Sequence, residues 1–544
     1  MTYARSLCSA LLMVCGLWLA GAPALAQAKA EAKATADEEI VELIISQPDS
    51  ATEPRRSLRN FFKAIKRRVA SVTGHVLPLT KSERWRVRKK DLPRVRREAA
   101  SQGVLVTELG ADWNHVFQSA STDIALSARQ RSMVELARAS KATTAVKIMA
   151  GPPPAKLEYA LTKDADDPHG SREPAKITVA LSDNTVLTIV RTSVDIKHDM
   201  YVWRGRTEQT GALVTLMWWP NGTMTGTVQQ QNQRIYSIRH LGGRLYAIVE
   251  LSGDRMPREH AAMPARLRSN DRSLRDDTLI QQGDASVLRP ATGGMRAPAP
   301  ARLEGAKKKQ QTISLPTQKA GAQSKDIIID VIVAYTKKAA GNYADVKREL
   351  VDLSIEEANE SFRMSKLGHV KLRLVHAYQT DYVEEGAHFD HVWRFADKGD
   401  GYMEEIHGLR DKHRADVAIL VVDDPKGCGL ATRVYADAEE AFAVMHHECA
   451  ATSYTLAHEI GHLIGARHDL GLDKNMKPFP YGHGYVNGTK WRDIMSYKES
   501  CGGCPRVPVW SSPKVQVKGE PAGTPELDNA RVIAEQAARV AAFR

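Results

Sequence analysis

A chain of 544 residues is longer than one ordinary domain, and its 43% of hydrophobic residues can fill more than one core, so a fibrous or wholly disordered protein is excluded. The net charge is +12, and much of the excess lies in residues 55–97, where Glu83 and Asp91 are the only acidic residues. Such a run can bind nucleic acid or an anionic membrane. Because no aromatic stacking pattern or nucleic-acid motif accompanies it, we interpret it as a solvated leader segment and expect no nucleic-acid partner.

The N-terminus has the pattern of an export signal. Arg5 precedes an apolar run over residues 11–19, and a small-x-small cleavage motif follows at 24–26. The alternative is a membrane anchor, but the apolar run is short for a bilayer and ends at Pro23. We therefore predict a signal peptide over residues 1–26, secretion to an extracellular or periplasmic location, and no stable membrane anchor.

The next two segments are predicted to form a propeptide. Residues 27–103 indicate a basic, partly disordered propeptide segment. Residues 104–255 contain short β-branched or aromatic runs, such as 213–219 and 245–249, which are separated by turn residues. This pattern predicts a β-rich propeptide domain.

A linker and a second ordered domain complete the chain. Residues 256–325 are rich in Pro, Gly and charged residues and poor in large apolar ones, which predicts a linker that proteases can reach. Residues 326–544 then alternate between buried strands and helical spacing, which predicts an α/β domain with a mixed sheet. We expect strands over 327–335, 370–378 and 416–422, and helices over 343–367 and 401–413.

The segment from His458 to His468 carries the chemistry. His458 and His462 are four residues apart, so on a helix they project from one face and can share a metal ion. Glu459 follows the first of them and is placed to act as general base on a water molecule. Gly465 can adopt a positive φ, which would end the helix and bring His468 round as a third ligand. Three protein ligands leave one position open, as in a catalytic zinc site, so we predict one catalytic Zn²⁺.

The segment allows other interpretations. The short motif occurs by chance in many helices, but the extended motif fixes five identities in an exported chain. A secreted adhesion or binding protein on an inactive scaffold would keep the fold without activity, and the intact Glu459 argues against it. The β-rich region could also be a substrate-binding module that the mature enzyme retains, rather than a propeptide.

A second motif adds a resemblance to a known family. Met495 stands in the sequence Asp-Ile-Met-Ser-Tyr over residues 493–497, downstream of the histidines. The two motifs together resemble the metzincin zinc metalloendopeptidases, whose α/β catalytic domain combines a mixed sheet, an active-site helix and a methionine-containing turn beneath the zinc. Asp469 directly after the third histidine resembles the reprolysin (adamalysin-like) branch. The resemblance implies a structural role for Asp469 and, for Tyr497, either oxyanion stabilisation or packing.

Within this branch the chain resembles the bacterial peptidyl-Asp metallopeptidases over about residues 326–544. That resemblance implies protein or peptide substrates and cleavage on the N-terminal side of acidic residues. Arg506 is our candidate for a basic residue that receives the acidic side chain after the scissile bond. The motifs that carry the resemblance are Tyr481-Gly-His-Gly-Tyr485, Ile494-Met-Ser-Tyr497, Cys501-x-x-Cys504-x-Arg506 and Trp510-Ser-Ser-Pro513.

Four cysteines remain after the predicted signal peptide: Cys428, Cys449, Cys501 and Cys504. An even number in an exported chain predicts two disulfides, although four cysteines allow three pairings. A second, structural zinc ion on these thiols is the alternative, and their spacing matches such a site poorly.

The propeptide would need a means of keeping the enzyme latent. Residues 27–325 contain no cysteine, so a propeptide thiolate cannot occupy the zinc. Asp254, Glu259 or His260 could instead displace the zinc-bound water, or these residues could simply begin a solvated linker. We expect an activating protease to cut the linker between about residues 266 and 325.

Overall fold

The computed structural model describes residues 39–46, 61, 75–77, 79–80, 82–110, 113–120, 124–162, 175–182, 185–197, 199–230, 232–259, 326–386 and 388–544. The predicted signal peptide and the linker beyond Glu259 lie outside the described residues. The chain forms two compact units. One comprises Met1–Ile124, Ile148–Met224 and Gly242–Tyr246, and the other comprises Ala125–Lys147, Thr225–Leu241 and Ala247–Arg544.

The first unit contains a small sheet that the sequence analysis did not anticipate. Its four strands have the order β2-β3-β1-β4, and one helix, α3, packs on it. The helix buries Leu92, Val95 and Ala99, which are spaced so that they share one face, against Trp85 of the sheet. The elements are β1 (Ile40–Ser46), β2 (His75–Val76), β3 (Glu83–Arg88), α3 (Leu92–Ser101) and β4 (Leu105–Glu108).

The region that was predicted to be β-rich contains a nine-stranded sheet of order β5-β6-β13-β12-β11-β10-β9-β8-β7. Two helices, α4 (Ala128–Ala139) and α5 (Pro154–Thr162), also lie in this region. In both helices the helical spacing of apolar residues is too weak to stand out from the strand patterns on either side. The strands are β5 (Gln118–Ser119), β6 (Thr143–Ala150), β7 (Lys176–Ser182), β8 (Thr185–Lys197), β9 (Met200–Thr207), β10 (Leu213–Trp218), β11 (Met224–Gln229), β12 (Arg234–Gly242) and β13 (Leu245–Ser252).

The C-terminal part of the second unit is built on a five-stranded sheet of order β15-β14-β16-β18-β17. Its first four strands are parallel, and β17 at the edge is antiparallel to β18, so the predicted mixed sheet is confirmed. Every residue of β16 is buried, as expected for a central parallel strand. The strands are β14 (Ile327–Tyr335), β15 (Val370–Gln379), β16 (Val417–Val422), β17 (Gly429–Ala431) and β18 (Phe442–His446).

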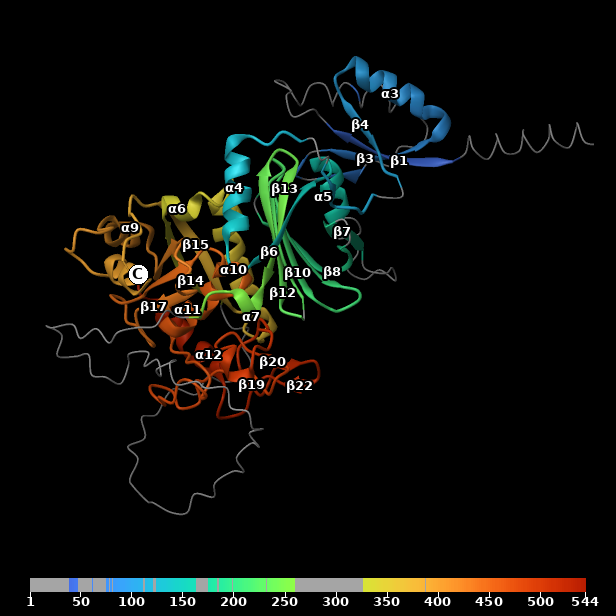
Figure 1. Ribbon diagram of the computed structural model, residues 1–544. Coiled ribbons are helices and arrows are strands. Elements are labelled where there is room, and N and C mark those ends of the chain that lie inside the picture. Colours follow the sequence, from blue (N-terminus) through green and yellow to red (C-terminus); the bar gives the residue numbers. More distant parts are fainter. Residues whose placement is uncertain are drawn as a thin grey trace, which may run out of the picture. The chain divides into compact units, whose positions relative to one another are not determined.

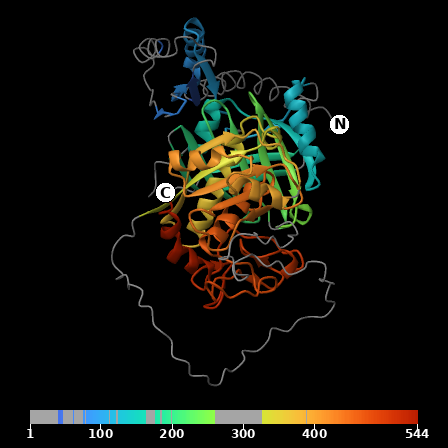
Figure 2. The ribbon, with the colours of Figure 1, turned by 90° about the vertical axis from the view of Figure 1, so that its left-hand side faces the viewer.

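Helices cover both faces of this sheet (Figure 1). One face packs on α7, α11 and α12, and the other packs on α8 and α9. In Figure 2 the red helix α12 lies beside the orange elements of the same unit. The helices are α6 (Lys337–Ala340), a π-helical turn (Lys347–Asp352) that continues into α7 (Leu353–Met364), α8 (His388–Ala396), α9 (Glu405–His413), α10 (Cys449–Thr452), α11 (Thr455–Ile464) and α12 (Asn529–Val540).

Short elements carry the chain between α11 and α12: β19 (Val486–Asn487), β20 (Trp491–Arg492), β21 (Gln516–Val517) and β22 (Glu520–Pro521). They form two separate two-stranded sheets, β19-β20 and β21-β22. Within the described part of the chain, no helix has the length and apolar character needed to cross a membrane.

Candidate metal centre and the adjoining pocket

Helix α11 presents the predicted histidine motif. All ten of its residues are buried, so His458 and His462 face the interior of the unit rather than solvent. The helix ends at Gly465, whose φ is +134°. A Cβ at this position would lie 2.8 Å from the Phe479 ring, so only glycine fits the turn. The helix thus ends in a glycine turn, and three residues later the chain reaches His468.

The three histidines meet at one point. The Nε2 atom of His462 lies 3.1 Å from that of His458 and 2.9 Å from that of His468, and the third distance is 3.2 Å. The Nδ1 atoms of His458 and His462 bind the backbone carbonyls of Ile494 and Ala466, each at 2.9 Å. Because a carbonyl accepts a proton, this pairing assigns the proton to Nδ1 and leaves Nε2 as a lone-pair donor. Lone pairs that converge so closely fit a cation, and neutral imidazoles suit zinc.

Glu459 lies beside this centre. Its side chain is buried, and neither carboxylate oxygen accepts a hydrogen bond of normal geometry from the described residues. A Cβ on Gly429, in the edge strand β17, would lie 2.4 Å from Glu459 Oε1, so the absence of a side chain there makes room for the carboxylate. Burial, and then the negative charge of Glu259, raise the pKa of Glu459 well above its usual range. A cation on the histidines would oppose that shift.

The other predicted residues surround the third histidine. The carbonyl of His468 accepts a hydrogen bond from His483 Nδ1 at 2.8 Å, and the Tyr497 ring packs edge-on against the His468 ring at 4.6 Å. The carboxylate of Asp469 accepts hydrogen bonds from the backbone amides of Gly471 and Tyr497, each at 3.0 Å. Asp469 thus ties the turn after the histidines to the segment that carries Tyr497. Met495 is buried and directly follows Ile494, whose carbonyl orients His458.

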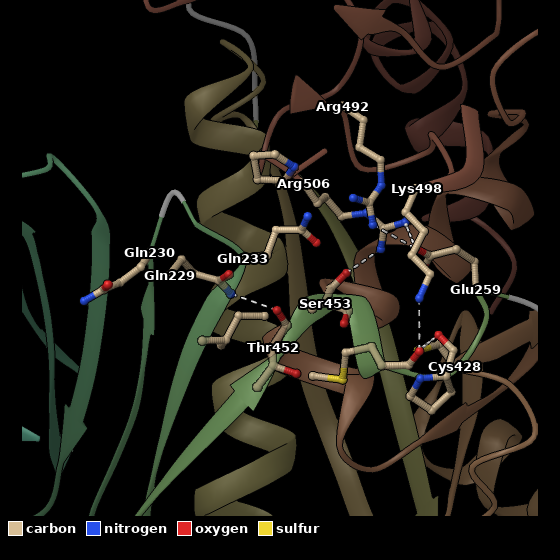
Figure 3. Close-up of a pocket in the computed structure, with 15 residues that line it drawn as sticks. Gln229, Gln230, Gln233, Glu259, Cys428, Thr452, Ser453, Arg492, Lys498 and Arg506 are labelled. Carbon is tan, nitrogen blue, oxygen red and sulfur yellow. Dashed lines mark hydrogen bonds and ion pairs between the residues drawn. The ribbon is translucent and has the colours of Figure 1, made fainter. Parts of the chain in front are cut away.

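A basic pocket adjoins the centre (Figure 3). Arg492 and Arg506 point at one carboxylate oxygen of Glu259, at 3.0 Å and 2.8 Å. Glu259 and both arginines are buried, with side chains no more than 9% exposed. Burial alone would raise the pKa of Glu259, but Arg506 and Arg492 outweigh it and hold that pKa below its usual range. The pocket therefore binds a carboxylate in its charged form.

This pocket corrects one expectation and extends another. We suggested that Glu259 could displace the zinc-bound water, but its carboxylate lies on the two arginines and is not part of the histidine cluster. Asp254 is likewise not part of that cluster, and His260 lies outside the described residues. Arg506 was anticipated, whereas Arg492 was missed. Its position just before the Asp-Ile-Met-Ser-Tyr motif was the signal that could have indicated it.

Among the described residues, a second group could hold a metal ion: Asp423, His446 and His447. Here Asp423 contacts Asn342 at 3.2 Å and His447 at 3.5 Å, and His447 Nδ1 lies 3.0 Å from the Tyr343 hydroxyl. These contacts tie Asp423 and His447 into a polar network at the ends of β16 and β18. The glutamate that follows His447, Glu448, pairs with Arg239 at 3.3 Å, whereas Glu459 has no such partner among the described residues, so the three histidines are the better candidate for a catalytic metal.

The cysteines form two disulfides, Cys428–Cys449 and Cys501–Cys504. The structure thus selects one of the three pairings, and paired sulfurs cannot hold the alternative structural zinc. Cys428 immediately precedes β17, and the second disulfide ends two residues before Arg506. The disulfides therefore fix the chain on two sides of the basic pocket.

Comparison with known proteins gives the family. Residues 325–511 match the model of metallo-peptidase family M12 named Reprolysin_5. A peptidyl-Asp metalloendopeptidase of Xanthomonas campestris pv. campestris is 34% identical over 324 residues, which are 59% of this chain and 68% of that protein. One of Stenotrophomonas maltophilia is 33% identical over 327 residues, again 59% and 68%. One of Pseudomonas fragi is 30% identical over 190 residues, which are 35% of this chain and all of that protein.

A solved structure, metalloproteinase-II from Bacteroides fragilis, is 11% identical and covers 57% of this chain and 86% of its own, with a TM-score of 0.32. That likeness is too low to carry an argument. The family model and the sequence relatives suffice, and M12 enzymes are metal-dependent and act on proteins or peptides. The chain therefore belongs to the M12 metallopeptidases, alongside the bacterial peptidyl-Asp metalloendopeptidases, and is a metalloendopeptidase.

Proposed function

We propose that this metalloendopeptidase uses one zinc ion, held by His458, His462 and His468, and that Glu459 is its general base. One observation carries the proposal: three histidine Nε2 atoms converge within 3.2 Å beside a buried carboxylate that accepts no normal hydrogen bond from the described residues. The alternative of an inactive adhesion scaffold offers no reason for keeping a desolvated carboxylate at this point.

Each residue of the centre has a separate role in the proposed reaction. A bound zinc ion supplies Lewis-acid chemistry, because it acidifies water and polarises a carbonyl. Glu459 accepts the proton of the attacking water and later delivers it to the leaving amine. The carbonyls of Ile494 and Ala466 hold two of the ligand rings in register. Tyr497, packed on the third ring, either stabilises the developing oxyanion or supports His468.

We further propose that the enzyme prefers an acidic residue directly after the scissile bond. Arg492 and Arg506 support this preference because they form a buried, doubly charged site that already binds a carboxylate. Such charge-assisted contacts discriminate strongly against neutral side chains. The name of the sequence relatives, peptidyl-Asp metalloendopeptidase, agrees with the same preference.

The proposal also includes secretion as a zymogen. The signal-peptide pattern of residues 1–26 supports export, and the linker before residue 326 is the expected target of an activating protease. N-terminal sequencing of the protein secreted by its own host would test both points. A mature N-terminus near residue 27, with full activity, would contradict the zymogen.

A peptide library tests the proposed specificity. The zinc-loaded enzyme, freed of its N-terminal fragment after a cut in the linker, should cleave peptides mainly before Asp and Glu. A preference for large apolar residues at that position would overturn the proposed role of the basic pocket. The proposed catalytic centre would then still stand on its own evidence.

A further inference from the structure

The segment Met256–Glu259, between the nine-stranded sheet and the linker, lies in the basic pocket. We infer that it is an internal inhibitor, in which Glu259 occupies the subsite for a substrate's acidic side chain. The inference rests on the proposed function, since it assigns an occupant to the same subsite. It differs from zinc ligation by a propeptide, because the contact is with the arginines.

Two backbone hydrogen bonds tie the segment to the start of the edge strand β17, without making it a strand of the sheet. The Cys428 amide donates to the Arg258 carbonyl at 2.7 Å, and the Gly429 amide donates to the Glu259 carbonyl at 3.0 Å. Successive residues of one stretch bond successive residues of the other, so the segment runs in the same direction as the edge strand β17. A peptide that adds to an exposed sheet edge gains affinity from such main-chain bonds. Because Gly429 also abuts Glu459, the segment covers the edge strand next to the proposed catalytic base.

The arginines are held rigidly for this contact. Arg506 donates to the carbonyls of Ser453 and Ser496, at 2.7 Å and 3.1 Å, and Arg492 also donates to Ser496, at 3.0 Å. These bonds leave the two guanidinium groups facing Glu259 (Figure 3). A preformed site loses little side-chain entropy when it binds, which favours a tight contact with any suitable carboxylate.

The segment is also anchored upstream. Lys498 donates to the carbonyls of Asp254 and Met256, at 3.1 Å and 3.2 Å. Farther back, β12 of the same unit is fixed by a buried ion pair from Arg239 to Glu448, at 3.3 Å. The carboxylate of Glu349 accepts the backbone amide of His240 in that strand, at 2.7 Å. These anchors give Glu259 a high effective concentration at the pocket, so an acidic substrate must compete with it.

The test compares two isosteric changes in the segment. Glu259→Gln removes the charge that the arginines bind, and Asp254→Asn, the matched control, changes a carboxylate five residues away that contacts neither arginine. The uncut, zinc-loaded chain of residues 27–544 is assayed with a quenched peptide that carries Asp after the scissile bond. Glu259→Gln should raise the initial rate roughly tenfold or more, as loss of a hydrogen bond to a charged group implies. Asp254→Asn should leave it unchanged.

A second readout does not depend on activity. In a chain inactivated by Glu459→Gln, hydrogen exchange of the Cys428 and Gly429 amides should be slow and should accelerate when Glu259→Gln is added. The inference would be overturned if Glu259→Gln changed neither the initial rate of peptide cleavage nor the hydrogen exchange of the Cys428 and Gly429 amides. Accumulation of active chain cut between Arg258 and Glu259 would also overturn it, because the segment would then be a substrate.

A peptide with the sequence of residues 250–259 covers the case in which the variant misfolds. Added to the native chain after its N-terminal fragment has been removed, it should inhibit, and the same peptide with Glu259→Gln should not. Equal inhibition by both peptides, or none by either, would contradict the inference. If the enzyme shows no acidic preference while the peptide still inhibits through Glu259, the proposed specificity fails and the inhibitor stands.

Discussion

At the scale of single residues, Glu459 is the most direct target. Glu459→Gln keeps the shape of the side chain and leaves all three histidines in place, so the metal content should be unchanged. Turnover should fall by about 10²–10⁴-fold, which is the typical contribution of a general base. Metal analysis and peptide hydrolysis on the same preparation check this, with Glu526→Gln, an exposed glutamate, as control. Loss of metal in Glu459→Gln would show that this residue is a ligand instead.

Arg506 tests the origin of specificity. Arg506→Gln removes one of the two charges of the proposed acid subsite, so kcat/KM for a peptide with Asp after the scissile bond should drop roughly 10- to 100-fold. A matched peptide with Ala at that position should change little. Arg531→Gln is the control, because Arg531 is an exposed arginine of the same unit paired with Glu535. An equal loss on both peptides would indicate a structural role.

The residues of the proposed catalytic centre can be recognised in the sequence more readily than those of the basic pocket. The histidines and Glu459 are recognisable because a helix and a turn place them by local geometry alone. The ion pairs of Glu259 with Arg492 and Arg506 join distant parts of the sequence, since Glu259 and Arg492 are 233 residues apart. Only the tertiary fold brings them together, so no local sequence pattern could reveal them. For the same reason the cysteine pairing stayed open until the fold was known.

At the scale of elements, the docked segment should respond to pH. The two arginines hold the pKa of Glu259 below the ordinary value of 4.5. The ion pair therefore contributes its full stability above about pH 4.5, and this contribution is lost as the pH falls through the lower pKa of the folded state. The groups that face it are the charged Arg492 and Arg506 and the nearby carboxyl of Glu459, whose pKa is raised. Breaking a buried ion pair by removing one partner costs about 3–5 kcal/mol.

The measurement is the free energy of unfolding between pH 3 and pH 7, in a chain inactivated by Glu459→Gln. The cost of adding Glu259→Gln should be about 3 kcal/mol at pH 7 and should shrink below about pH 4.5. A cost that is constant over this range would mean that the charge of Glu259 does not matter.

The elements themselves were predicted unevenly. The buried strands β14 and β16 were recognisable from continuous apolar runs, and the observed β15 agrees with an alternating one. The helix expected over 343–367 begins only at Lys347, with a π-helical turn, and α8 was not expected at all. Tertiary packing sets such boundaries, and the residue pattern there does not favour one helix start over another.

At the scale of the whole molecule, the second unit combines pieces of the predicted propeptide with the protease. Residues 125–147 and 225–241 belong to it together with residues 326–544. Cutting the linker alone should therefore leave Glu259 in place. We expect the two fragments to elute together on size exclusion, with activity rising only when the N-terminal fragment is degraded or displaced. Separation of the fragments immediately after cutting would contradict this.

The central claim is that one metal ion on three histidines makes this chain a peptidase. The most direct measurement is zinc per chain, determined together with peptide hydrolysis, for the native chain and for His462→Ala, both freed of their N-terminal fragments. The account predicts one zinc per native chain, and loss of both zinc and activity in the variant. Full hydrolysis by a chain that holds no metal, or by His462→Ala, would contradict it.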